Sequence, residues 1–147
     1  MNIEIEVLAG EGKLEALKKC FENGFTQEEL NIALENAIAY SQLNTAEYLL
    51  SLGADITYYD YQGVYYAVHN NELIGLQYAI TKGVDINFNK GLLLNTAIVS
   101  SINSKDTQLL KWMLENGANA NLLSKGSLVM TQEFGTEELK KLLEEYS

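Results

Sequence analysis

The sequence contains no arginine and no proline, and it has a single cysteine, Cys20, and a single histidine, His69. A lone cysteine cannot form an internal disulfide, so a disulfide framework is excluded and a reducing compartment is favoured. One histidine and one cysteine are also too few for the ligand sets that hold structural zinc within one chain. We therefore expect no metal site.

Long apolar runs are missing as well. No stretch of 18 apolar residues occurs, which predicts that the chain does not span a membrane. The first residues, MNIEIEVLAG, are acidic and lack the basic region and apolar run of a secretory signal. These absences favour a cytoplasmic protein.

Positive charge is scarce: ten lysines stand against 20 acidic side chains, for a net charge of −10. No lysine lies between Lys19 and Lys82, whereas that stretch holds Glu22, Glu28, Glu29, Glu35, Glu47, Asp55, Asp60 and Glu72. A protein that binds the phosphate backbone of a nucleic acid needs positive charge, so we expect no nucleic-acid partner. The acids either form a solvated surface that keeps the chain soluble or attract a basic partner.

Turn sequences recur along the chain. The glycines of these turns lie 29, 30 and 34 residues apart, in Asn23-Gly24-Phe25, Gly53-Ala54-Asp55, Gly83-Val84-Asp85 and Gly117-Ala118-Asn119. Each turn follows an apolar helical stretch, and glycine just past such a stretch is typical of a helix C-terminus. The pattern predicts left-handed glycines that end four helices.

A second helical pattern lies between these turns. Ala37, Ala67 and Ala97 are each 30 residues apart, and the breaks that follow this pattern carry Gly12, Ser41, Asn71 and Gly135. These residue types suit a left-handed backbone. The helices before the glycine turns also align in apolar columns, such as Leu17, Ala46, Leu76 and Leu110. We expect these columns to form a core between stacked helix pairs.

In these residues the sequence resembles an ankyrin repeat protein, whose unit of about 33 residues is a β-turn followed by two antiparallel helices. The family's helix ending is visible from Leu43 to Asp55 and again from Leu73 to Asp85. The resemblance implies an all-α fold, an α-solenoid of about five such repeats in a single domain. The units are approximately 1–26, 27–55, 56–85, 86–119 and 120–147. The family's Thr-Pro-Leu-His start is missing and the links are about three residues short, so we expect short, irregular hairpin links.

Signs of catalysis are few. No Walker loop, GxSxG, HExxH or paired-carboxylate motif occurs, so we expect a non-enzymatic protein without a cofactor. A catalytic set with His69 as base, Asp60 as its orienting partner and a nearby serine as nucleophile is supported by residue type alone. Asp55 and Asp85 belong to the turns, where they are expected to accept backbone hydrogen bonds. Cys20 falls in an apolar column and is expected to be a small core residue.

Tyrosine is abundant, and five of the nine tyrosines lie within residues 58–66. In the ankyrin arrangement the hairpin tips and the exposed side of the first helices form a concave binding face, and tyrosine is a good interface anchor. Mapped by register, the candidate protein-binding residues are Tyr40, Tyr58, Tyr59, Asp60, Tyr61, His69, Asn70, Phe88 and Asn89. The alternative is that several of these rings pack between repeats. For Tyr48, Tyr78 and Trp112 we expect inter-repeat packing or a place on the convex surface.

These observations favour a protein-protein interaction module over an enzyme. The first hypothesis is an intracellular inhibitor or neutraliser, of the immunity or host-directed type, that covers the working surface of a basic protein. We expect a monomer or a one-to-one complex. The second hypothesis is a scaffold or adaptor subunit, which should present two separate binding surfaces.

Overall fold

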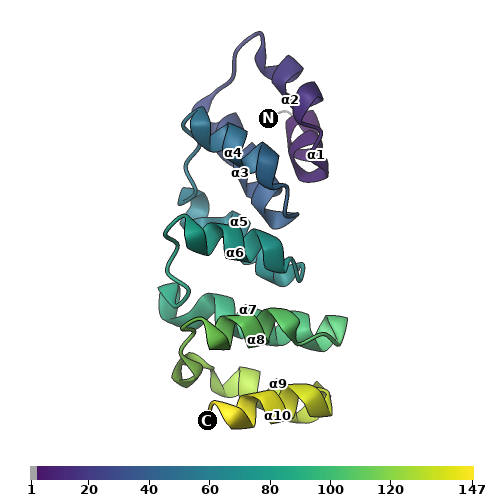
Figure 1. The fold of residues 1–147 in the computed structure, drawn as a ribbon, viewed down its shortest axis with the longest axis vertical. Coiled ribbons are helices and arrows are strands. Elements are labelled where there is room, and N and C mark those ends of the chain that lie inside the picture. The colour runs from purple at the N-terminus through teal and green to yellow at the C-terminus, as the bar shows by residue number, and fades with distance from the viewer. Residues whose placement is uncertain (1–2) are drawn as a thin grey trace.

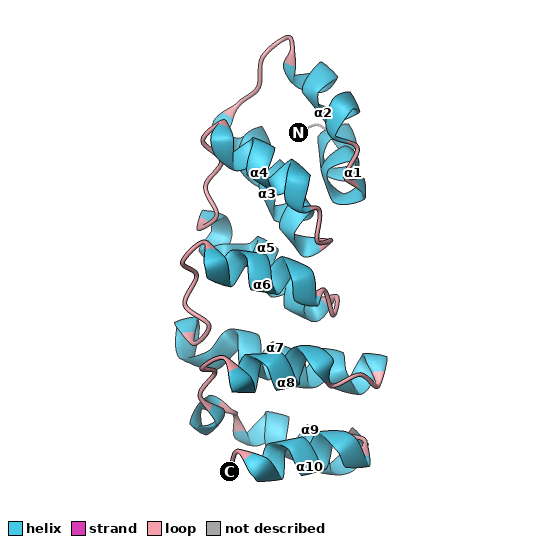
Figure 2. Ribbon diagram, in the orientation of Figure 1, coloured by secondary structure: helices cyan, strands magenta, loops and turns pink. Residues whose placement is uncertain are grey.

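The computed structural model describes residues 3–147, and within them the chain is helical, with no strand (Figures 1 and 2). The predicted all-α class is confirmed. Its helices are α1 (Ile3–Glu11), α2 (Leu14–Phe21), α3 (Gln27–Ala39), α4 (Leu43–Ser51), α5 (Tyr58–His69), α6 (Leu73–Thr81), α7 (Phe88–Ser104), α8 (Gln108–Glu115), the short 3-10 helix η1 (Ala120–Leu122), α9 (Lys125–Phe134) and α10 (Glu137–Glu145). None of these helices is both long and apolar enough to cross a membrane.

The helices form five successive pairs that stack in a row, from α1 and α2 at one end to α9 and α10 at the other (Figure 1). Helices α1, α3, α5, α7 and α9 each contact the next and form the first-helix layer. Helices α2, α4, α6, α8 and α10 lie against them as the second-helix layer. The links between pairs and the breaks within pairs lie along opposite edges of the stack (Figure 2).

The core occupies the space between the two layers. Leu17, Ala46, Leu76 and Leu110, the predicted apolar column of the second helices, are all fully buried, as are Ala37, Ala67 and Ala97 of the first helices. Small residues in these columns let neighbouring helices approach closely. Cys20 is half-buried against the same core. The columns that repeat in the sequence therefore do form the core.

Left-handed residues end the helices largely where the sequence predicts. The four turn glycines, at positions 24, 53, 83 and 117, have φ between 96° and 106°. Within pairs, Gly12, Ser41 and Asn71 have φ of 73°, 60° and 59°. The prediction for Gly135, in the fifth pair, is wrong, because its φ is −73°. In the fourth pair Lys105 is left-handed, with φ of 55°. Gly135 is needed for space instead: a Cβ there would lie 2.5 Å from the carbonyl oxygen of Thr131.

The links between pairs are not the predicted short hairpins. Before the main part of α5, the backbone makes one left-handed turn, with φ of 48°, 52° and 63° at Tyr59, Asp60 and Tyr61. Before that of α7, Asn89, Lys90 and Gly91 repeat the same turn. The link before α9 contains η1, and the link before α3 ends in a capping box between Thr26 and Glu29. The described links contain no strands, and those before α5 and α7 pass through a left-handed turn into the helix.

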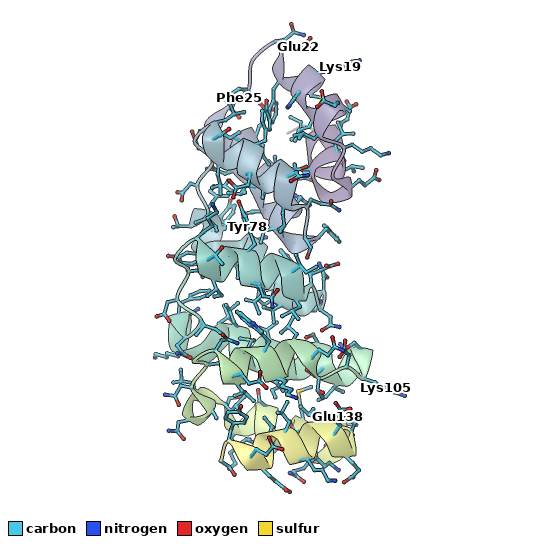
Figure 3. The ribbon with its side chains drawn as sticks, in the orientation of Figure 1. Lys19, Glu22, Phe25, Tyr78, Lys105 and Glu138 are labelled. Carbon is cyan, nitrogen blue, oxygen red and sulfur yellow. The ribbon has the colours of Figure 1, made fainter. Side chains whose placement is uncertain are left out.

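Hydrogen bonds between polar side chains join the second pair to the third and the fourth to the fifth. The Ser41 hydroxyl donates to Glu72 Oε2 at 2.8 Å, and the Thr107 hydroxyl donates to Glu138 Oε1 at 2.6 Å. On the second-helix layer, the Tyr78 hydroxyl donates to Glu47 Oε1 at 2.8 Å (Figure 3). These bonds join residues 31 positions apart, so they fix the register of the stack.

Candidate functional site

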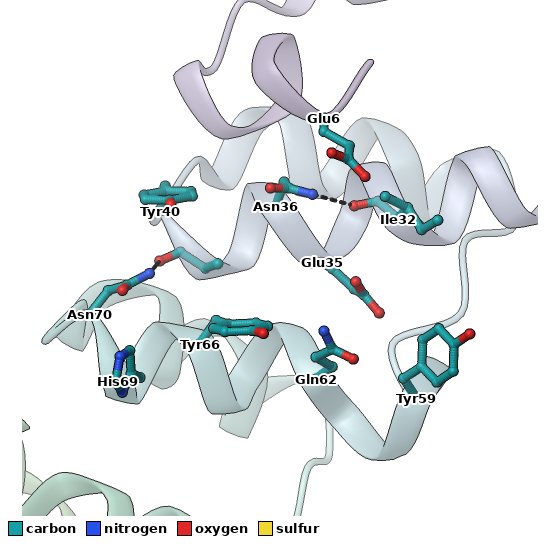
Figure 4. A pocket seen from close by; sticks show the side chains of 11 residues that line it. Glu6, Ile32, Glu35, Asn36, Tyr40, Tyr59, Gln62, Tyr66, His69 and Asn70 are labelled. Carbon is teal, nitrogen blue, oxygen red and sulfur yellow. Dashed lines mark hydrogen bonds between the residues drawn. The ribbon is translucent and has the colours of Figure 1, made fainter. Parts of the chain in front are cut away.

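A cavity of about 450 Å³ opens on the first-helix layer between α1, α3 and α5 (Figure 4). Its lining residues are Glu6 from α1; Ile32, Glu35, Asn36, Ala39 and Tyr40 from α3 and its end; and Tyr59, Gln62, Tyr66, His69 and Asn70 from α5 and its end. The wall therefore combines two carboxylates, three tyrosine rings, amides and a few aliphatic groups. A volume of this size lies within the range that holds a small ligand or a large side chain.

The position of the cavity depends on a close approach of α5 to α3. A Cβ on Gly63 of α5 would lie 2.9 Å from Cα and 3.1 Å from the carbonyl oxygen of Glu35. Real Cβ atoms do not come so close to backbone, so glycine allows the two helices to touch here. The approach places the Glu35 side chain between the helices rather than in open solvent.

Glu35 carries the unusual electrostatics of the site. Burial, with a smaller contribution from the charge of Glu6, raises the pKa of the Glu35 carboxyl from 4.5 to about 7. Its Oε1 atom is buried and has no hydrogen-bond partner within residues 3–147. A carboxylate oxygen in that state loses hydration without compensation, which favours uptake of a proton or of a cation.

Three exposed tyrosine rings line the same cavity as this carboxyl group. Tyr40, Tyr59 and Tyr66 are 49%, 66% and 40% exposed. The Tyr65 ring lies edge-on to Tyr66, with ring centroids 5.3 Å apart, and stacks on His69, with centroids 6.0 Å apart. Tyrosine rings left open to solvent around a hollow are the usual anchors of protein interfaces.

The left-handed turn of residues 59–61 sets the direction of two rings. Asp55 Oδ1 accepts hydrogen bonds from the Thr57 amide at 2.9 Å and from its hydroxyl at 2.7 Å. Both bonds lower the pKa of Asp55, and the equivalent Asp85 accepts from the Asn87 amide at 2.9 Å. The expected backbone hydrogen bonds to these aspartates are confirmed. The turn that follows directs Tyr59 to the cavity and Tyr61 to the core.

The structure separates the predicted binding residues into groups. Four of them, Tyr40, Tyr59, His69 and Asn70, line the cavity. Asp60 and Asn89 are exposed on the two left-handed turns, outside this cavity. Tyr58 is half-buried, and its hydroxyl lies 3.4 Å from Glu28 Oε1. The centroid of its ring lies 4.5 Å from that of Tyr59.

Tyr61 and Phe88 have a different environment. Their ring centroids are 4.9 Å apart, and both rings are half-buried against the core between the third and fourth pairs. The alternative of packing between repeats therefore applies to these two residues. Tyr78 is also a packing residue, with only 8% exposure, and Trp112 is half-buried against the core.

The middle of the first helices supplies lining residues that the sequence interpretation missed. They are Glu6, Ile32, Glu35, Asn36, Gln62 and Tyr66. Their spacing was an available signal, because positions 32, 35, 36 and 39 share one face of a helix, as do 62, 66 and 69. The residues predicted by register lie instead at the links and at the C-terminal ends of these helices.

Within residues 3–147, the acids that line the cavity, Glu6 and Glu35, take part in none of the ion pairs. The ion pairs of residues 3–147 join five lysines to Glu11, Glu15, Glu47, Glu115 and Glu137. None of these acids belongs to α3 or α5, and neither helix contains a lysine. Residues 20–81 hold eight acids and no lysine, so they account for eight of the ten net negative charges. The second and third pairs therefore concentrate the negative charge.

Chemically, the site offers carboxylates and rings rather than a metal centre. No three His, Cys, Asp or Glu side chains are grouped as metal ligands in the part of the chain that the structure describes. The imidazole of His69 lies against Tyr65, and Asp60 is not among the lining residues of its cavity. The arrangement is suited to binding a group of positive charge.

Comparison of the chain with models of known protein families finds no match, and comparison with curated proteins finds no significant relative.

Proposed function

We propose that the chain is a non-enzymatic protein-binding module, an α-solenoid of five ankyrin-like repeats that holds a basic protein on its first-helix layer. The repeat assignment is supported by five helix pairs with four left-handed turn glycines and buried columns in register. The single cysteine fits work in a reducing cytoplasm.

One observation supports the binding face most strongly. The cavity between α1, α3 and α5 combines exposed tyrosines with acids that take part in none of the ion pairs of the described residues. Uncompensated charge beside large rings is complementary to a surface rich in lysine or arginine. A bound module of this kind acts most simply as an inhibitor, because it covers the surface with which the partner works.

A scaffold is the second candidate, and one observation favours it. A further cavity, of about 470 Å³, lies between η1, α9 and α10, where Leu123, Leu128, Leu143 and Tyr146 contribute to its wall. Leu128 is 47% exposed. A second surface with apolar walls at the other end of the stack would let the chain hold two proteins at once.

The test begins with recovery of the bound protein from native cells by cross-linking, and its identification. Affinity of that protein is then measured for the wild type, Tyr59→Ala and Leu128→Ser. If the chain is an inhibitor, it should form a one-to-one complex, and only Tyr59→Ala should lower the affinity for the partner. Recovery of two proteins, each of which loses affinity with a different variant, would support the scaffold. A partner that neither variant affects would remove both surfaces from consideration.

A further inference from the structure

We infer that the cavity around Glu35 is a receptor for one basic side chain, arginine or lysine, presented by the partner protein. The inference rests on the proposed function and deepens it, because it assigns the chemistry of the contact and the residue that makes it. The cationic head would lie against the Glu35 carboxylate, and its alkyl stem would lie along the rings.

The first reason is the unsatisfied carboxylate. Glu35 extends from α3 toward Gln62 and Tyr59 on α5, with Glu6 reaching toward α3 from α1 (Figure 4). Glu35 Oε1 is buried and has no hydrogen-bond donor within the described part of the chain. An ammonium or guanidinium group supplies the missing donors and the compensating charge together.

The second reason is the wall around it. Tyr59 and Tyr66 offer ring faces for a cation, and Ile32 and Ala39 offer aliphatic surface for methylene groups. Basic side chains combine an apolar stem with a charged head, so this wall matches both parts. An acidic or phosphorylated segment would instead meet two carboxylates.

The third reason is that no lysine is paired with an acid of this cavity among the residues that the structure describes. The helices that form most of the wall, α3 and α5, contain no lysine, and the ion pairs of residues 3–147 use other acids. The titratable groups that line the cavity are Glu6 from α1, Glu35 from α3, Tyr40 just past the end of α3, and Tyr59, Tyr66 and His69 from α5. The site is therefore open to a cation from outside.

The geometry also implies a dependence on pH. The pKa of Glu35 is raised to about 7, so the carboxyl group changes from mostly neutral to mostly charged across neutral pH. A cation binds the charged form, and we expect affinity to rise about tenfold between about pH 6 and about pH 8. Because an imidazole can gain a proton in this range, the profile is measured in His69→Gln protein as well.

The experiment uses three capped peptides as probes: acetyl-Gly-Arg-Gly-amide, its lysine equivalent, and its citrulline equivalent, which has nearly the shape of arginine without the charge. NMR titration of the whole chain follows the amides of the cavity residues and the carboxyl carbon of Glu35. The arginine or lysine peptide should give saturable shifts at the cavity and should lower the titration midpoint of Glu35. The citrulline peptide should give neither.

Variants make the test specific. Glu35→Gln keeps the shape of the side chain, and it should weaken the basic peptide at least about fivefold and remove the pH dependence. Glu22→Gln changes the net charge equally at the far end of α2 (Figure 3) and should bind as the wild type does. Equal binding of citrulline and arginine peptides, no saturation up to about 50 mM, or full affinity in Glu35→Gln would each overturn the inference.

The identified partner separates this inference from the proposed function. A partner that is lost with Tyr59→Ala but binds Glu35→Gln normally would overturn the receptor site and leave the binding face in place. A partner unaffected by either variant would overturn both.

Discussion

Gly63 of α5 lies directly on the backbone of Glu35 in α3, so close that a methyl group at residue 63 would lie 2.9 Å from Cα of Glu35. This contact brings the third helix pair against the second, and it turns an otherwise ordinary glutamate into a half-buried acid. The packing of the stack and the chemistry of the cavity therefore depend on the same pair of residues.

The first prediction concerns this contact. Gly63→Ala should lower the free energy of unfolding by about 1–3 kcal/mol, because the added methyl forces α3 and α5 apart. Gly126→Ala is the matched control, since Gly126 lies exposed in α9 with its nearest atom 3.8 Å from the new Cβ. That control should be neutral or slightly stabilising. Urea denaturation measures both, and equal stability of the two variants would contradict the close packing.

The second prediction concerns pH and stability. The folded-state pKa of Glu35 lies at about 7, above its ordinary value of 4.5, so the fold binds the proton more tightly than the unfolded chain does. The contribution of Glu35 to the free energy of unfolding is fully present below about pH 4.5 and is lost as pH rises through about 7.

Glu35→Gln should remove this loss. Between about pH 4.5 and about pH 7, the free energy of unfolding of the wild type should fall by about 1–2 kcal/mol relative to that of the variant, after allowance for partial solvent screening. Denaturation curves at several pH values give the difference between the two proteins, in which the other titrating groups cancel. A difference that does not change with pH would mean that the carboxyl group is well solvated.

The third prediction separates two neighbouring rings. Tyr59 is 66% exposed at the cavity, whereas the ring of Tyr61 packs on that of Phe88 with centroids 4.9 Å apart. Tyr59→Ala should weaken partner binding by more than about 1 kcal/mol with little change in stability. Tyr61→Ala should lower stability by about 2 kcal/mol, because it leaves space beside Phe88. The reverse pattern in calorimetry and thermal unfolding would place Tyr61 in the interface.

The fourth prediction concerns the second-helix layer. Tyr78 donates a hydrogen bond to Glu47 at 2.8 Å, and Glu47 also pairs with Lys82 at 2.7 Å. Tyr78→Phe should cost about 1 kcal/mol of stability and leave partner affinity unchanged. Tyr146→Phe, at the exposed end of the chain, should cost nothing. Loss of the partner in Tyr78→Phe protein of normal stability would assign this layer a binding role.

Much of the stack could be predicted from repetition in the sequence. The turn glycines and the buried alanines recur at intervals near 30 residues, because each pair must solve the same packing problem as its neighbour. Tyr59, by contrast, belongs to three successive left-handed residues, which no propensity favours outside glycine and asparagine. The register of the sequence therefore predicted one binding face for both Tyr59 and Tyr61, whereas the turn directs Tyr59 to the cavity and Tyr61 to the core.

The burial of Glu35 was harder to predict for a related reason. Its column in the 30-residue register continues as Tyr65 and Asn95, so the position repeats without repeating its chemistry. Its pKa is raised by burial, to which the close approach of α5 at Gly63 contributes, and by the charge of Glu6 on α1. Such a group is created by contacts between repeats, and a single repeat does not reveal it.

The most direct test of the account is to map, by amide chemical shifts, where the identified partner touches the chain. We expect the shifts to concentrate on the cavity side of α1, α3 and α5, at residues such as Tyr40, Tyr59 and Tyr66. Shifts confined to α2, α4 and α6, or to the pair α9 and α10, would contradict the assignment of the first-helix layer as the binding face.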